Sequence, residues 1–433
     1  MLLLVGAVAG LIWANLPDTD SYTDFWHAHI ALDFNIVEID LSLKHWVNDG
    51  LMAIFFFVVG LEIKRELLRG ELAEPRKAAL PVAAALGGMV VPALIYTALN
   101  FGGDGERGWG IPMATDIAFA VGVMALLGAR APLSLKVFLL ALAIVDDLGA
   151  IAVIAIFYTE QIEFGWLALA VGLFALTAIL GQIGVRDLVV YAAIALVAWL
   201  AVHESGVHAT IAGVMLGLLT PVKAVYERRE VELKVLALAE DLRRGDESAT
   251  VEGDELQQSA LRELEEVARE TQPVLDRLEH ALHPWTSYLI IPTFALANAG
   301  VVLNADVVSD AASSPISWGV ALGLVIGKPL GIVLFSFAAV RLGVATLPAG
   351  VRWLRLTGAG ILAGIGFTVS LFIADLAFTS EELIDEAKIG ILAGSALMGV
   401  AGYALLRALP PEREANERAP AVRDLSASAV SEG

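Results

Sequence analysis

The sequence predicts an all-α polytopic membrane protein with about twelve transmembrane helices, inverted repeats and two broken helices that cross. Three observations support this fold class. The chain of 433 residues is 57% hydrophobic, whereas soluble domains average roughly 45–50% apolar residues. Apolar runs recur along it, most of them long enough for a bilayer core of about 30 Å. Two of these runs are interrupted by glycine or proline in corresponding positions, which is typical of inverted-repeat membrane folds.

The predicted transmembrane segments are marked by their length and by glycine, proline or charge at their ends. In chain order they lie near residues 2–15, 46–63, 78–99, 110–128, 134–158, 165–183, 187–202, 207–220, 285–303, 317–339, 354–378 and 388–407. Segments seven and eight are short, so the pattern does not define the boundary between them.

The charge of the loops predicts the orientation. Basic residues follow the even-numbered segments: Lys64, Arg65, Arg69, Arg76, Lys77, Arg130, Arg186, Lys223, Arg228, Arg229, Arg341 and Arg352. Acidic residues follow the odd-numbered segments: Asp18, Asp20, Asp24, Asp104, Glu106, Glu160, Glu163, Asp306, Asp310, Glu381 and Glu382. Lys44, Arg107 and Lys388 are the few basic residues of these odd loops and do not change the bias. By the positive-inside rule the even loops and both termini are cytoplasmic.

Four regions follow one another along the chain. They are residues 1–223 with segments one to eight, an acidic cytoplasmic insertion at 224–282, residues 283–409 with segments nine to twelve, and a disordered cytoplasmic tail at 410–433. The outer loop 16–45 contains FNIVEIDLSL, whose alternating apolar residues indicate a β-strand or hairpin. Within the insertion, ELQQSALRELEEVARE has helical periodicity, whereas GDESATVEGDE has the composition of a disordered segment.

The broken segments are the fourth and the eleventh. They carry Gly108, Gly110, Pro112 and Thr115 ahead of Asp116, and Gly358, Gly360, Gly364 and Gly366. Close packing of neighbouring helices is an alternative reason for such glycines. The presence of both interruptions, together with Asp116, favours two broken helices that meet at a binding site.

Asp146 and Asp147 lie side by side in an otherwise uncharged run, VFLLALAIVDDLGAIAVIAIFY. A charge at the centre of a membrane helix costs about 2.5–3.5 kcal/mol, and intramembrane carboxylates usually handle protons or cations. Lys328, near the centre of segment ten, is too deep to reach the membrane surface comfortably. Because adjacent helical residues point about 100° apart, we expect one aspartate to pair with Lys328 and the other to face an ion pathway. A purely structural ion pair is the alternative.

Enzymatic functions fit the sequence less well. HESGVH places His203 and His208 at i and i+5, whereas two zinc ligands on one helix face need i and i+4. An intramembrane aspartyl protease could share a proton between two aspartates, but that chemistry leaves Lys328 without a role. Cysteine is absent, which excludes thiol nucleophiles and disulfides. With a net charge of −20 and no basic patch, no nucleic-acid partner is expected.

Charged residues gather at the predicted cytoplasmic side. Glu62, Arg65, Glu66 and Arg69 lie on neighbouring turns of GLEIKRELLRGELAEPRK, and Glu279, His280 and His283 precede segment nine in LEHALHPW. Charges at helix ends are most often solvated anchors. Because histidine changes charge near neutral pH, a pH-sensing role is the alternative.

Several sequence blocks resemble the signature blocks of the NhaA-type sodium/proton antiporters. They are NDGLMAIFFFVVGLEIKREL, IPMATDIAFAVGV, LALAIVDDLGAI, SGVHATIAGV, LEHALHPW, GKPLGI and GIGFTVSLFIA. The matches run in order from about residue 43 to about residue 400, and together they are highly specific. Two features depart from the family pattern: the first helix is short, and the loop at 224–282 is longer than is usual.

The resemblance implies a role for each matched residue. Asp146 and Asp147 match the essential aspartates that hold Na⁺ or Li⁺, with Asp147 as the main cation ligand and Asp146 as the partner of Lys328. Asp116 and Thr115 match residues at the crossing of the broken helices, on the cation path. The pH-responsive cytoplasmic region is matched by Glu62, Arg65, Glu66, Glu279, His280 and His283, and another pH-linked position by His208.

The resulting hypothesis is a secondary active antiporter, not an enzyme, that extrudes Na⁺ or Li⁺ in exchange for external H⁺. Transport is expected to be electrogenic and pH-regulated, with a role in sodium, pH and salt homeostasis. The resemblance implies no cofactor, membrane lipid as a partner, a location in the bacterial inner membrane, and a homodimer formed through the outer loop after helix one. A passive cation channel with an acidic pore is the alternative, against which Lys328 and the broken helices argue.

Overall fold

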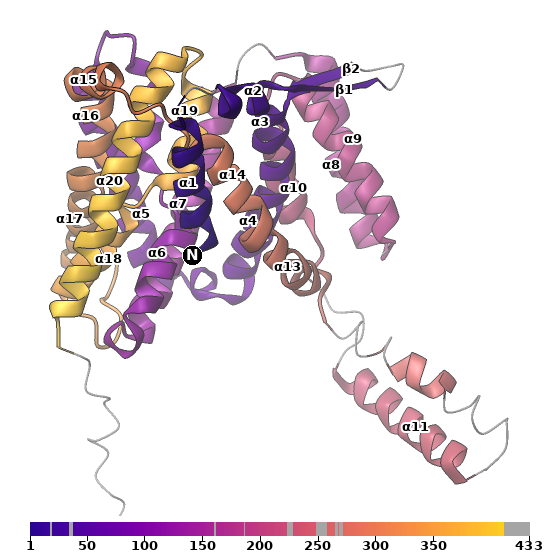
Figure 1. The fold of residues 1–433 in the computed structure, drawn as a ribbon. Helices are drawn as coiled ribbons and strands as arrows, with labels where there is room; N and C mark the ends of the chain where they lie inside the picture. The colour runs from indigo at the N-terminus through magenta and orange to yellow at the C-terminus, as the bar shows by residue number, and fades with distance from the viewer. Residues whose placement is uncertain are drawn as a thin grey trace, which may run out of the picture.

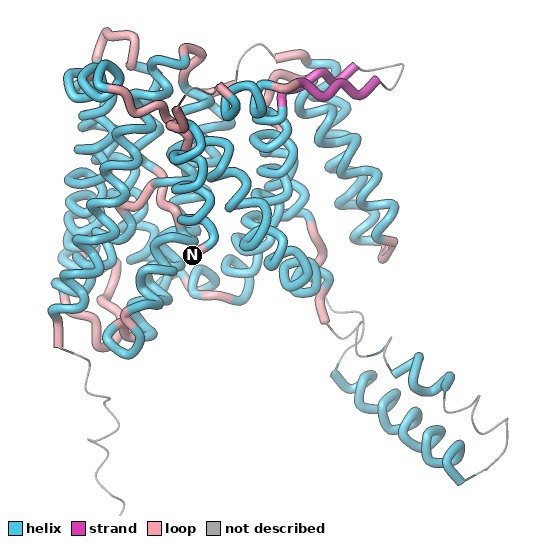
Figure 2. The backbone as a smooth tube through the Cα atoms, in the orientation of Figure 1, coloured by secondary structure: helices cyan, strands magenta, loops and turns pink. Residues whose placement is uncertain are grey.

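In the part of the chain that the structure describes, the fold is helical apart from one small hairpin (Figures 1 and 2). A computed structural model describes residues 1–17, 20–33, 38–159, 162–185, 187–222, 228–247, 258–264, 267 and 272–410. The hairpin pairs β1 (His29–Asp33) with β2 (Glu38–Ser42) in antiparallel register, His29 opposite Ser42. It occupies the outer loop for which the alternating residues predicted a strand. The tail after Pro410 lies outside the described residues.

The N-terminal part of the chain supplies the counterparts of the first eight predicted segments. Its helices are α1 (Leu2–Ala14), α2 (Ser21–His27), α3 (Leu43–His45), η1 (Trp46–Leu51), α4 (Met52–Arg69), η2 (Glu71–Ala73), α5 (Pro75–Asn100), η3 (Glu106–Met113), α6 (Ile117–Leu126), η4 (Gly128–Arg130), α7 (Leu133–Phe157), α8 (Phe164–Gln182), α9 (Leu188–Glu204) and α10 (Thr210–Leu219). α3, η1 and α4 form one continuous span, Leu43–Arg69. Segment two is therefore longer than the predicted 46–63, and Lys44 belongs to its helix.

The C-terminal part supplies the insertion and the last four segments. Its helices are α11 (Arg228–Glu247), α13 (Val274–Trp285), η5 (Thr286–Ile290), α14 (Ile291–Asn298), α15 (Ala305–Ser313), α16 (Pro315–Leu322), η6 (Gly323–Gly327), α17 (Lys328–Arg341), α18 (Trp353–Ala363), α19 (Phe367–Ala377) and α20 (Glu381–Ala408). α20 begins seven residues before the predicted start at 388. Lys388 therefore lies inside a helix rather than in a loop.

Length and apolar composition confirm an all-α polytopic membrane protein. In the described part of the chain, seven helices are long and apolar enough to cross a membrane, and the bent pair α18 and α19 makes up to eight. The other predicted segments correspond to shorter apolar helices, α1, α9 and α10, and to the run α13–η5–α14. The short helices account for the brevity of segments one, seven and eight in the sequence.

Packing divides the helices into two bundles. The crossing bundle consists of α5, η3, α6, α7 and α15 to α20, and its tightest pair is α5 with α17. The hairpin bundle consists of α1 to α4, α8 to α10, α13 and α14, and its tightest pair is α4 with α10. Small residues bring these backbones together: a Cβ on Gly87 would collide with the carbonyl of Gly331, and one on Gly213 with that of Ala53. Glycine in these helices therefore does serve close packing.

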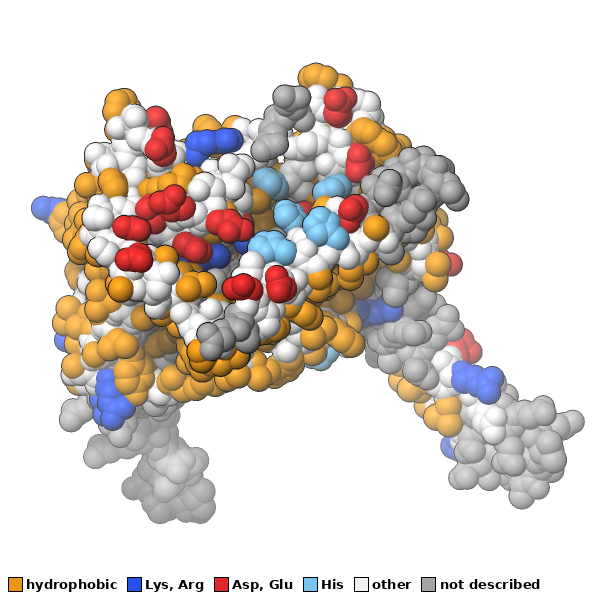
Figure 3. Space-filling model, turned by 45° about the horizontal axis from the view of Figure 1, so that its top comes forward, with side chains coloured by type: hydrophobic (Ala, Val, Ile, Leu, Met, Phe, Trp, Pro, Cys, Tyr) orange, Lys and Arg blue, Asp and Glu red, His pale blue; other side chains and the backbone are white. Residues whose placement is uncertain are grey.

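The two ends of the bundles differ in the elements that they carry. The hairpin end bears β1, β2 and α15, and the insertion end bears the connection to α11, which extends away from both bundles (Figure 1). Figure 3 turns the hairpin end toward the viewer and shows acidic and histidine side chains gathered on it. The insertion has a small core of its own in Leu238, Ala260 and Val267. Its α11 was not predicted from the sequence; most of GDESATVEGDE lies outside the described residues.

Candidate ion-binding site

The two broken segments cross within the crossing bundle. In segment four, η3 ends at Met113 and α6 begins at Ile117, with extended backbone between them. In segment eleven, α18 and α19 are bent by 45° at their junction. The breaks meet directly, because the Asp116 backbone N–H donates to the Ile365 carbonyl at 2.6 Å. α6 lies toward the insertion end and α19 toward the hairpin end (Figure 1), the opposed arrangement expected for inverted repeats.

Asp116 caps both helices that begin at the crossing. Its Oδ1 accepts from the Phe119 backbone N–H at 2.8 Å, in the first turn of α6. Its Oδ2 accepts from the backbone N–H and hydroxyl of Thr368, at 3.1 and 2.6 Å, in the first turn of α19. A helix N-terminus carries unpaired N–H groups and a partial positive charge. One buried carboxylate therefore stabilises two helix N-termini, and each of its oxygens accepts at least one hydrogen bond.

Hydroxyl groups satisfy the carbonyls freed by the broken helices. Thr115 Oγ1 donates to the Ala363 carbonyl at the end of α18 at 2.8 Å. Ser370 Oγ donates to the Ile111 carbonyl near the end of η3 at 2.7 Å. Non-helical backbone is tolerated at membrane depth only when its polar groups find such partners. Thr115 thus holds the crossing together, and it also lies beside Asp146.

Lys328 and Asp146 form a buried ion pair next to the crossing. Lys328 Nζ lies 2.5 Å from Asp146 Oδ2, and both side chains are fully buried. Lys328 also donates to the carbonyl of Met113, the last residue of η3. A cation at the C-terminal end of a helix is stabilised by the partial negative charge there. Lys328 therefore compensates a carboxylate and a helix end together.

Asp147 lies on α7 directly after Asp146, but it points elsewhere and makes no contact with the Lys328 ammonium group. It is 3% exposed, and its Oδ1 is buried without a hydrogen-bond partner. Oδ1 of Asp146 is likewise without a partner. Unsatisfied buried carboxylate oxygens are costly, and they are the ligands that hard cations and protons prefer. The two free oxygens make this pair the strongest candidate ion site in the described residues.

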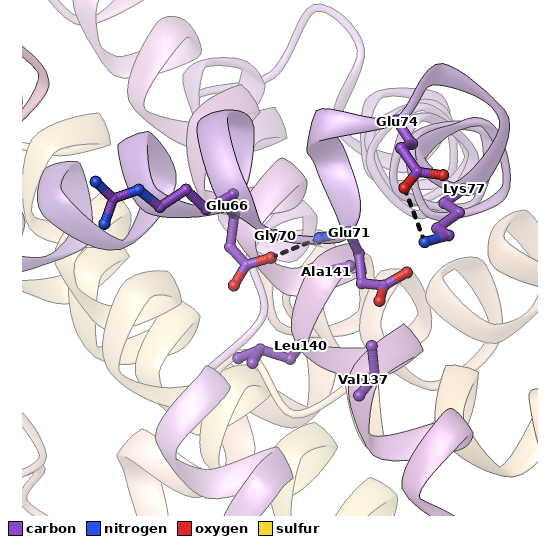
Figure 4. Close-up of a pocket in the computed structure, with 9 residues that line it drawn as sticks. Glu66, Gly70, Glu71, Glu74, Lys77, Val137, Leu140 and Ala141 are labelled. Atoms are coloured by element: carbon purple, nitrogen blue, oxygen red, sulfur yellow. Dashed lines mark hydrogen bonds and ion pairs between the residues drawn. The ribbon is translucent and has the colours of Figure 1, made fainter. Parts of the chain in front are cut away.

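A cavity of about 320 Å³ opens at the insertion end, between α4 of the hairpin bundle and α5 and α7 of the crossing bundle. Its polar wall carries Glu66, Arg69, Glu71, Glu74 and Lys77. Figure 4 shows the carboxylates of Glu66 and Glu71 pointing into this space, opposite Val137 and Leu140 of α7. This acidic cavity therefore lies against α7, the helix that also carries the two aspartates.

The residues assigned to a pH response fall into separate places. Arg65 pairs with Glu279 of α13 and lies 3.7 Å from Glu66, so these three residues come together at the cavity mouth. Glu62 lies one turn away on the same helix, close enough to interact electrostatically with all three. His280 and His283 are exposed.

His208 lies elsewhere, at the opposite end of the molecule. It stands just before α10, within electrostatic range of Asp49 and together with His45 and His203. The structure therefore separates His208 from the residues at the insertion end by the depth of the bundle. A shared pH-responsive cluster of all seven assigned residues is not formed.

Some polar contacts were not anticipated from the sequence. Thr368, which binds Asp116, follows the glycines of segment eleven and was not predicted as a site residue. Lys44 and Lys388 were assigned to loops, yet Lys388 is 7% exposed and Lys44 pairs with Asp375 at 3.1 Å. Asp375 carried a usable signal, since it is a lone charge inside an apolar run.

Comparison with known proteins identifies the family. A family model described as Na⁺/H⁺ antiporter 1 matches residues 1–406. The chain belongs to this family. Its members are secondary transporters, so the protein is a transporter rather than an enzyme.

Similar full-length proteins carry the name Na⁺/H⁺ antiporter NhaA. The protein of Rhodopirellula baltica is 47% identical over 415 residues, covering 94% of this chain and 90% of its own length. That of Wolinella succinogenes is 48% identical, with 92% and 88% covered. That of Helicobacter pylori is 46% identical, with 94% and 92% covered. These relatives are bacterial, and the apolar helices place this family member in a membrane with multiple passes.

Proposed function

We propose that the protein is a secondary antiporter that extrudes Na⁺, and also Li⁺, in exchange for H⁺ entering from outside. The observation that carries this proposal is the buried, unpaired Oδ1 of Asp147, next to a Lys328–Asp146 ion pair and two broken helices. Family membership supports sodium/proton exchange. No cofactor takes part, since the reaction needs only the two ions and a titrating carboxylate.

Competition between the two ions for one carboxylate explains the exchange. Ionised Asp147 binds the cation, and protonation of the same oxygens releases it. An empty, ionised site is costly to move through a low-dielectric interior, so the site crosses only when it is loaded with a cation or with protons. Coupling follows because Na⁺ and H⁺ cannot occupy Asp147 together.

The Lys328–Asp146 pair explains why exchange is electrogenic. When Na⁺ binds at Asp147 with a contribution from the free Oδ1 of Asp146, the Lys328 ammonium group loses its counter-charge and gives up a proton. Two protons then return for each Na⁺ that leaves. The membrane potential drives this cycle with about 2.3 kcal/mol per net charge per 100 mV.

Regulation by pH is assigned to the cavity mouth. Arg65, Glu66 and Glu279 form a contact between α4 and α13 that depends on carboxylate charge, and the exposed His280 and His283 extend it. Glu62 joins this group to the site, since it lies within electrostatic range of Asp147. His208 would respond separately, from the hairpin end. Such regulation suits a role in sodium, pH and salt homeostasis.

The basic loops assign the insertion end to the cytoplasm of a bacterial inner membrane, with both chain termini inside. The acidic hairpin end then faces outward (Figure 3). The hairpin of β1 and β2 is the element through which a homodimer would form, and lipid surrounds the apolar helix faces. In this orientation the cavity beside Glu66 is the entry for cytoplasmic Na⁺.

Proteoliposomes test the proposal. An imposed Na⁺ gradient should move protons in the opposite direction, and a membrane potential should change the rate. Asp147→Asn should lack this coupled flux. A passive channel would instead conduct Na⁺ with no counter-movement of protons, and that result would overturn antiport.

A further inference from the structure

A polar contact joins the two bundles at the hairpin end, away from the ion-binding site. Lys44 Nζ lies 3.1 Å from Asp375 Oδ1, and Asn48 Nδ2 donates to Asp375 Oδ2 at 2.9 Å. Lys44 and Asn48 belong to the hairpin bundle, whereas Asp375 lies in the last turn of α19 in the crossing bundle. Both oxygens of one carboxylate are therefore held by the other bundle.

This contact is largely withdrawn from water. The side chain of Asp375 is 9% exposed and that of Lys44 21%. Asn48 is fixed from behind by Asn298, which is fully buried and donates to the Asn48 side-chain oxygen at 2.8 Å. Lys388 and Asp385 of α20 form a further ion pair, and Lys388 interacts electrostatically with Asp375 and Lys44. Separating a buried ion pair costs free energy unless each charge finds a new partner.

Helix α19 connects this contact to the ion site. Thr368 in its first turn binds Asp116 at the crossing, and Asp375 follows seven residues later. At 1.5 Å per residue the two contacts are about 10 Å apart on one rigid helix. Any movement of the crossing bundle against the hairpin bundle therefore displaces Asp375 relative to Lys44 and Asn48.

At the insertion end, a cavity of about 320 Å³ lies between α4 of the hairpin bundle and α5 and α7 of the crossing bundle. At the hairpin end, by contrast, Asp375 is bound across the interface, and an exposed contact of His27 with Glu381 at 3.7 Å adds to it. Exposed pairs of that kind contribute little, so the buried Asp375 contact is the one that can hold this end closed.

We propose that Lys44, Asn48 and Asp375 form an outer latch, which closes the ion site toward the hairpin end and must release before the site opens there. The latch rests on the proposed antiport, since it describes one step of that cycle. It makes Asp375 a further positioning residue for transport, acting on access and not on ion binding.

Cross-linking tests the latch directly, because the chain contains no cysteine. Asn48→Cys with Asp375→Cys, bridged by a short bifunctional methanethiosulfonate, should lose Na⁺-driven proton flux and regain it on reduction. The matched control is Asn15→Cys with Leu303→Cys. In this pair Asn15 Oδ1 accepts from the Leu303 N–H at 2.6 Å, at the same end of the molecule but away from Asp375. Bridging it should leave flux unchanged. Full flux in the bridged Asn48–Asp375 variant would overturn the latch.

Single substitutions provide a second measurement. Asp375→Asn or Lys44→Gln should lower the population of the state that is open at the insertion end, and so raise the apparent KM for cytoplasmic Na⁺ by about fivefold. The charge swap Lys44→Asp with Asp375→Lys should restore the original KM. A merely structural role would reduce kcat or the amount of folded protein and leave KM in place.

A labelling experiment separates failure of the latch from failure of antiport. In Ala374→Cys the thiol lies one residue before Asp375, at a position that is fully buried, and a membrane-impermeant maleimide added at the hairpin end should react slowly. Adding Lys44→Gln should accelerate labelling several-fold. This measurement requires no transport. Unchanged labelling would reject the latch even if antiport is observed, whereas accelerated labelling without coupled flux would reject the proposed antiport alone.

Discussion

Asp116 and Asp147 are two buried aspartates of the crossing bundle that use their carboxylate oxygens differently. Asp116 is 1% exposed and Asp147 3%. Asp116 lies at the break in segment four, and Asp147 lies near the centre of α7. Every oxygen of Asp116 accepts a hydrogen bond from a helix N-terminus. Asp147 has an oxygen with none. Sequence and burial alone would assign the two residues the same role.

The difference shows that burial alone does not define the role of a carboxylate. The hydrogen bonds that its oxygens accept indicate whether it stabilises the fold or binds an ion. A carboxylate such as Asp116, whose two oxygens both accept hydrogen bonds, is already compensated. An unsatisfied one such as Asp147 carries a cost that a cation or proton removes. We therefore assign Asp116 to holding the broken helices together and Asp147 to binding the transported ion.

Asp147→Asn should abolish Na⁺-dependent proton flux and leave the protein folded and inserted. The amide keeps the shape of the side chain but removes the charge that titrates and binds the cation. Flux in proteoliposomes and the elution profile in detergent measure the two effects. Asp104→Asn makes the same chemical change in an exposed loop and should transport normally. Flux at the original level in Asp147→Asn would contradict its role as the carrier.

Lys328→Ala should lower the free energy of unfolding by about 3–5 kcal/mol, since it leaves a buried carboxylate without its counter-charge. Transport should change as well, because Asp146 would then keep a proton at higher pH. A double-mutant cycle with Asp146→Asn, followed by unfolding in detergent, should give a coupling of about 1–3 kcal/mol. Additive effects would show that the two side chains do not act as a pair.

Asp116→Asn should cost about 1–2 kcal/mol of stability, as the loss of a helix cap does, and should reduce flux without abolishing it. The amide keeps one acceptor oxygen but turns its NH₂ group toward an N–H donor. Thr368→Val removes one partner of Asp116 and should have a smaller effect in the same direction. Complete loss of flux with unchanged stability would indicate that Asp116 is an ion ligand. It would contradict the different roles assigned to Asp116 and Asp147.

The membrane class, the segments and the charged residues at their centres were predictable because each is visible in one dimension. A lone charge in an apolar run is conspicuous, so Asp146, Asp147 and Lys328 could be found. Helix geometry narrowed the partner of Lys328 only to one aspartate or the other, since adjacent residues diverge on a helix, and the resemblance implied Asp146. In the structure, Asp146 is the aspartate that pairs with Lys328.

The contact of Lys44 and Asn48 with Asp375 could not be predicted from the sequence, for a different reason. Lys44 and Lys388 stand near the ends of apolar runs, where basic residues usually meet water, and α20 begins earlier than its apolar pattern does. The partner of Lys44 is 331 positions away. Contacts between bundles depend on how helices are arranged, which periodicity within one helix does not contain.

Glu279→Gln should move the pH at which transport begins by up to about 0.7 unit, because partly exposed ion pairs contribute up to about 1 kcal/mol. The direction is toward lower pH: neighbouring carboxylates lose protons more readily once a negative charge is removed. Flux against pH is the measurement. His280→Gln and His283→Gln should give smaller shifts, since both side chains are exposed. An unmoved profile in all three variants would place regulation elsewhere.

Deletion of residues 240–265 should have the smallest effect and leave coupled flux and its pH profile in place. The insertion is polar, with 16 acidic and nine basic side chains between residues 221 and 283, and α11 lies apart from both bundles (Figure 1). The two ends of the insertion stay fixed to α4. Arg69 of that helix donates to the Val222 carbonyl at 2.6 Å and pairs with Asp276 at 3.2 Å. Arg69→Gln is the matched variant. It removes the contacts of Arg69 with Val222 and Asp276 beside the cavity and should alter flux more than the deletion does. Loss of transport in the deletion variant, with the protein still inserted, would show that the insertion takes part in the transport cycle.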